Sequence, residues 1–197
     1  MKKKILVLAV IAMSFSIMAY NTLAYFTSEA TAHNVITSHR VNITIEEWQQ
    51  TDEGIVPYPN EPIKVMPASK VSKIVTAKNN EADAYIRARF DVVVMDSEGK
   101  SMELDGETLD SIIEVALNTT YWETKEVDDG WLYYKDTVGT GIATNPLFTE
   151  VVFSGVNMTN EYQNCTVKID VIAQAVQSKN NPGTSALTAQ GWPSVEE

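Results

Sequence analysis

The chain has few of the residues that build common catalytic and metal centres. Its 197 residues include one cysteine and two histidines. The single cysteine, Cys165, excludes an intramolecular disulfide, and its place at the start of an apolar run predicts a buried thiol. His33 and His39 lie six residues apart, which is not the His-Glu-x-x-His spacing that brings two imidazoles to one zinc ion. We therefore expect ordinary exposed histidines, with no zinc-protease motif and no serine-type triad.

Positive charge is scarce beyond the first residues. The formal net charge is −11, and the first 24 residues hold three lysines and no acid, so the remaining 173 carry 12 basic and 26 acidic residues, a charge of −14. This balance argues against nucleic-acid binding, which needs a basic surface. Acidic pieces such as Asp128-Asp129 lack the spaced ligands of a calcium-binding loop. We predict no cofactor, and calcium or zinc is supported by no motif.

The chain opens with the layout of a secretory leader. Lys2, Lys3 and Lys4 precede an apolar run of 16 residues ending at Tyr20, and Thr22-x-Ala24 offers small residues for cleavage. A membrane-spanning helix needs roughly 20 apolar residues. We therefore predict an N-terminal signal helix that is cleaved between Ala24 and Tyr25, so that the rest is secreted and only the uncleaved leader meets the membrane.

Alternating apolar and polar residues predict a mainly β protein. Val41, Ile43 and Ile45 alternate with polar residues in an extended segment over 35–48, and proline-rich 49–67 predicts a surface loop or a sheet-edge passage. Further strands are predicted over 71–78, 84–95, 121–126, 131–135, 147–153 and 166–177. Apolar spacings of three and four predict one helix over 105–118, with a short second helix over 185–190.

Two arginines stand out on the clearest predicted strand, which covers 84–95. Arg87 and Arg89 are two residues apart and so project from the same face. An exposed stripe that faces solvent or a partner is the simpler interpretation, and an acid-binding patch is the alternative.

Several segments resemble the TasA and camelysin family of Gram-positive bacteria. In chain order these segments are Leu23–Asn34, Pro67–Val71, Asn79–Arg87, Gly130–Lys135, Asn145–Phe148 and Ile169–Gln177. The resemblance implies an antiparallel jelly-roll-like β-sandwich with one or two short helices, a dedicated signal peptidase for the leader, and a role in biofilm-matrix fibres. The strand pattern alone leaves an immunoglobulin-like sandwich equally open.

Three parts follow from these patterns: a signal peptide over 1–24, an N-terminal tail and first strand over 25–48, and a β-sandwich domain over 49–197. We predict a secreted structural protein of the matrix or cell surface that assembles with itself or with related subunits. Donation of the N-terminal strand, through Val41, Ile43 and Ile45, is the predicted mode of joining. The alternative is a camelysin-like secreted or cell-wall-associated metal-dependent endopeptidase, which is implied by the resemblance alone.

Overall fold

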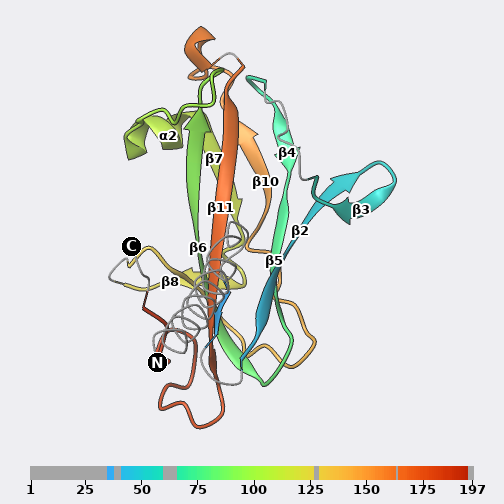
Figure 1. Ribbon diagram of the computed structural model, residues 1–197, viewed down its shortest axis with the longest axis vertical. Coiled ribbons are helices and arrows are strands. Elements are labelled where there is room, and N and C mark those ends of the chain that lie inside the picture. Colours follow the sequence, from blue (N-terminus) through green and yellow to red (C-terminus); the bar gives the residue numbers. More distant parts are fainter. Residues whose placement is uncertain (1–34, 38–40, 60–65, 127–128, 163, 195–197) are drawn as a thin grey trace, which may run out of the picture. The chain divides into compact units, whose positions relative to one another are not determined.

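The computed structural model describes residues 35–37, 41–59, 66–126, 129–162 and 164–194 (Figure 1). The described residues all belong to one compact unit, Val35–Glu197. The predicted signal helix, the predicted cleavage position at Ala24 and Tyr25, and both histidines lie outside the described residues.

One layer of the fold is a five-stranded sheet with the order β1-β11-β6-β9-β8. Its strands are β1 (Val35–Thr37), β6 (Ala84–Met95), β8 (Trp122–Thr124), β9 (Leu132–Tyr134) and β11 (Thr166–Gln177). Strands β6 and β11 pair antiparallel along their whole length and form the long central pair in Figure 1. The strands predicted over 84–95 and 166–177 and the β8–β9 hairpin are confirmed. Only β1 runs parallel to its neighbour.

Two three-stranded antiparallel sheets complete the fold, with the orders β3-β2-β5 and β4-β10-β7. Their strands are β2 (Ile43–Thr51), β3 (Gly54–Pro57), β4 (Lys70–Ser72), β5 (Ile74–Asn79), β7 (Ile113–Leu117) and β10 (Phe148–Phe153). Strands β4 and β5 are separated only by Lys73, so the single strand predicted over 71–78 is divided between two sheets. The backbone N–H of Lys73 donates to Thr149 O at 3.1 Å. On one side of Lys73, β4 pairs with β10, and on the other side β5 pairs with β2.

The helix predicted over 105–118 is wrong in its second half. Helix α2 covers Gly106–Ile112, with Asp105 as its N-cap. At Ile113 the backbone turns to φ −132° and ψ 123°, and the chain continues as β7, which pairs with β10. The β-branched residues Ile113 and Val115 suit a strand, and that pairing outweighs the helical spacing of the apolar residues.

The segment predicted over 49–67 as a surface loop or sheet-edge passage contains the end of β2 and the edge strand β3, in agreement with the sheet-edge alternative. Strand β2 continues to Thr51 and turns back as β3, which gives the hairpin at the right of Figure 1. Gly54 has φ 121°, which glycine adopts without strain. Pro57 is tolerated because β3 is an edge strand, where a missing N–H need not break a ladder.

One apolar core joins the inner face of the five-stranded sheet to the two smaller sheets. Its buried residues include Ile43, Val75, Ile86, Trp122, Phe148, Val151, Val171 and Ala173. Phe90 from β6 meets Phe148 from β10 edge-on, with 5.6 Å between ring centroids. The fold is therefore mainly β, with antiparallel sheets around a shared core.

A second, smaller core lies on the opposite face of the five-stranded sheet. Tyr85, Trp131, Tyr133 and Val176 of the sheet region are covered by Ala186 and Ala189, with Trp192 packed beside them. The covering segment, 178–194, was predicted to contain a helix over 185–190, but it forms turns. A single helical bond, Ala189 N–H to Ser185 O at 2.9 Å, remains there.

Candidate functional site

The residues predicted for strand donation lie in the chain's own core. Val41, Ile43 and Ile45 are 2, 1 and 8% exposed. Ile43 and Ile45 belong to β2, where they pair with Asn79 and Ala77 of β5. The boundary predicted after residue 48 falls inside β2. These side chains thus stabilise the subunit in which they are found.

The β11 edge that faces β1 in the five-stranded sheet is only partly paired among the described residues. Strand β1 pairs with Ala173, Gln174 and Ala175 of β11, and within the part of the chain that the structure describes it has no other strand partner. Among the described residues, the rest of that β11 edge, 166–172, has no strand partner. An unpaired edge exposes backbone N–H and C=O groups to any extended chain that can reach it.

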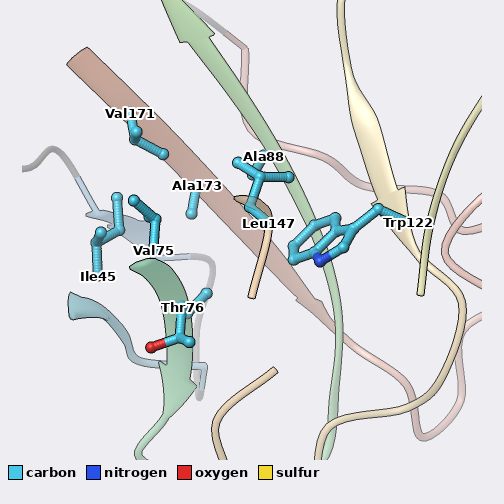
Figure 2. A pocket seen from close by; sticks show the side chains of 9 residues that line it. Ile45, Val75, Thr76, Ala88, Trp122, Leu147, Val171 and Ala173 are labelled. Carbon is cyan, nitrogen blue, oxygen red and sulfur yellow. The ribbon is translucent and has the colours of Figure 1, made fainter. Parts of the chain in front are cut away.

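A small apolar cavity lies inside the main core, close to this edge. Figure 2 shows it bounded by Ile45 and Val75 on one side and by Ala88, Ala173 and Trp122 on the other. Its volume of about 10 Å³ is near the minimum that holds one water molecule. This space can accept one or two methyl groups of a neighbouring side chain and is too small for an organic substrate.

The outer face of the sheet holds a buried arginine. Arg87 on β6 is 8% exposed, and it donates from Nε and Nη2 to Gln174 Oε1 at 3.0 and 2.7 Å. Its guanidinium carbon lies 4.1 Å from the ring centroid of Trp131 and 4.7 Å from that of Trp192. Cation–π contact and the amide oxygen stabilise this charge. The exposed stripe expected from the sequence is therefore wrong for Arg87.

An acid is linked to Arg87 through a tyrosine. Arg87 Nη1 donates to Tyr133 Oη at 3.3 Å, and that hydroxyl donates to Asp129 Oδ2 at 2.6 Å. Partial burial acts to raise the pKa of Asp129, but hydrogen bonds from Tyr133 and Lys125 lower it overall. Lys125 Nζ lies 3.2 Å from the same carboxylate oxygen, so Asp129 is balanced by its own lysine.

The single thiol is buried, as predicted. Cys165 Sγ lies 3.7 Å from Met102 Sδ, and burial raises the pKa of the thiol. Since the thiolate is the reactive form, this environment disfavours nucleophilic chemistry.

Within the described ranges, no group of three or more His, Cys, Asp or Glu residues is placed to hold a metal ion. In the same part of the chain, no helix has the length and apolar character needed to cross a membrane.

Sequence reasoning missed Gln174, Trp131 and Trp192 as parts of one cluster. The sequence held one signal of this cluster. Residues 131 and 133 are two apart and so lie on the same face of a strand, and the apolar residues at 186 and 189 require an apolar surface to pack against.

Comparison with known proteins finds no matching family model, no matching curated protein and no matching solved structure.

Proposed function

We propose that this chain is an exported structural subunit that joins copies of itself, or related subunits, into extracellular filaments. Its leader is removed between Ala24 and Tyr25, and its folded part is a jelly-roll-like β-sandwich. The observation that carries the proposal is the short β1 pairing at the edge of the five-stranded sheet. The resemblance to the TasA and camelysin family supports the same role.

The β1 pairing is easily exchanged between copies. Among the described residues it involves three residue pairs, on one side of β11. The same segment from a second copy would form the same backbone bonds, which is the condition for a low-cost strand swap. A longer donated segment would also extend along 166–172, which has no strand partner among the described residues. The donor is then the segment ending at Thr37, while Val41, Ile43 and Ile45 stay in their own core.

Repulsion between acidic copies opposes this assembly. With a formal charge of −14 after cleavage, subunits repel each other at low salt, and at 0.15 M the Debye length is about 8 Å. Filament growth should therefore accelerate as salt rises. The uncleaved precursor should not assemble, because its donor segment remains tied to the membrane by the leader.

Electron microscopy of the chain starting at residue 25 tests the proposal across a range of salt concentrations. A matched chain starting at residue 41 keeps β2 but lacks β1, and it should give the same circular dichroism without filaments. A peptide covering 25–40 should cap growth, whereas a scrambled peptide should not. Filaments from the chain starting at residue 41 would refute donation, and monomers of the longer chain at every salt concentration would refute the structural role.

A further inference from the structure

The outer face of the five-stranded sheet concentrates an unusual share of the chain's guanidinium groups. The whole chain has three arginines, and two of them, Arg87 and Arg89, are neighbours on this face of β6. Both lie against the ring of Trp131, with the Arg89 guanidinium carbon 5.3 Å from its centroid. Neither arginine has a carboxylate partner within the described residues, in a chain whose net charge is −11.

The same cluster holds an excess of hydrogen-bond donors. Three buried side-chain atoms have no hydrogen-bond partner in the described part of the chain: Arg89 Nε, Gln174 Nε2 and Trp192 Nε1. Gln174 is 1% exposed, and its oxygen is fixed by Arg87, so the assignment of its Nε2 as a free donor follows from the hydrogen bonds. Buried donors are normally paired, and all the unpaired buried side-chain atoms of the described residues are donors, which points to a missing acceptor group.

Nearby acids do not supply that acceptor. Asp129 is taken by Tyr133 and Lys125. Asp91 lies two residues beyond Arg89 on the same strand face, but the two side chains form no ion pair in the described structure. Arg89 is half-buried as a residue, and its Nε is fully buried.

The segment that covers the cluster is held by apolar packing and by few hydrogen bonds to the sheet. Among the described residues, 179–194 form hydrogen bonds only with one another and with Ser178. Ser178 in turn donates to Asp83 O, at the start of β6. Trp192 is held there by ring contacts with Arg87 and Tyr133. Moving Trp192 aside would uncover the Arg87 guanidinium, against which its ring packs, at the cost of few hydrogen bonds.

We propose that this cluster binds an acidic peptide segment. Arg89 forms a charge-assisted hydrogen bond with a carboxylate of the peptide, and Gln174 and Trp192 donate hydrogen bonds to further oxygens of the peptide. A planar carboxylate matches the guanidinium fork. The indole rings of Trp131 and Trp192 suit the methylene stem of a glutamate, which an inorganic anion lacks. This site does not depend on strand donation.

Fluorescence anisotropy with dye-labelled hexaglutamate tests the site at low salt. The acidic protein repels this probe overall, so saturable binding reports a local site. Arg89→Gln should weaken binding by about tenfold or more, the scale of one charge-assisted pair. Arg89→Lys should be intermediate, since it keeps the charge without the fork. Lys168→Gln removes a cation that is already paired with Asp170 on β11, and it should change binding less than about twofold.

The position of binding is read from the arginine Nε–H signals in nitrogen-15 NMR, of which the chain has three. Signals of Arg87 and Arg89 should shift with hexaglutamate and stay in place with hexaglutamine. Absence of saturable binding, or equal binding by Arg89→Gln, would overturn the proposal. Competition by inorganic phosphate as effective as that by unlabelled hexaglutamate would overturn the peptide assignment in favour of a general anion site.

Discussion

A buried asparagine offers the sharpest test of how the strands are tied together. Asn79 ends β5 and is 0% exposed. Its Nδ2 donates to Ala82 O at 2.9 Å and to Val138 O at 2.8 Å, and its Oδ1 accepts from the N–H of Glu81 at 3.3 Å. Its backbone N–H also bonds Ile142 O. One side chain therefore fixes the β5–β6 turn against the loop before β10.

Asn79→Asp removes both donors without changing the side chain's shape. Ala82 O loses its partner and faces a carboxylate, while Val138 O keeps a bond from Ala84 N–H at 3.0 Å. An unsatisfied buried carbonyl costs about 1–3 kcal/mol, and the buried charge adds to this, so we expect a loss of about 3 kcal/mol in the free energy of unfolding.

The assay is urea unfolding followed by tryptophan fluorescence. Asn80→Asp is the matched control, because Asn80 is exposed and its side chain donates to Thr44 Oγ1 at 2.8 Å, on the surface of the molecule. It should cost less than about 1 kcal/mol. The reasoning fails if the two substitutions destabilise the protein equally, or if Asn79→Asp unfolds at the same urea concentration as the unmodified chain.

Three further predictions concern a cap, a glycine and an ion pair. A hydrogen bond from Thr108 N–H lowers the pKa of Asp105. The contribution of this bond to the free energy of unfolding is complete above the pKa of Asp105 in the unfolded state, and it is lost as pH falls through the pKa in the folded state. The stability lost in Asp105→Asn should therefore shrink below about pH 4 in urea melts. Gly183→Ala should detach the C-terminal segment and speed hydrogen exchange there, because a Cβ would clash with the backbone oxygen of Thr188; unchanged exchange would contradict this. Lys73→Met breaks a 2.7 Å pair with Glu47 and should cost about 3 kcal/mol in chemical unfolding, largely recovered when Glu47→Leu is added.

The long strands were predictable because their pattern is strong and local. In β6, Ile86 and Ala88 alternate with Arg87 and Arg89, and the strand has the bounds expected from the sequence. The end of α2 was not predictable in the same way. Ile112 and Ile113 fit a helical stripe and a strand equally well, and only the distant β10 decides between them.

The candidate sites were predictable only in part. Charge and strand parity placed Arg87 and Arg89 on one face, but an arginine on a polar face is normally exposed. Burial of Arg87 depends on Gln174, 87 residues later in the chain, and on Trp192. Such a long-range arrangement leaves little local trace.

The two proposed sites meet on one short stretch of β11. Register places Ile36 of β1 opposite Gln174, and the Gln174 side chain is the one that holds Arg87. When a neighbour's strand replaces β1, it binds the backbone of the residue that orients the arginine cluster. Any shift of β11 in that exchange would move the Gln174 amide and change the affinity of the outer face. If the exchange moves β11, hexaglutamate should bind filaments and monomers with different affinities, whereas equal affinities would show that the β11 edge and the outer face act independently.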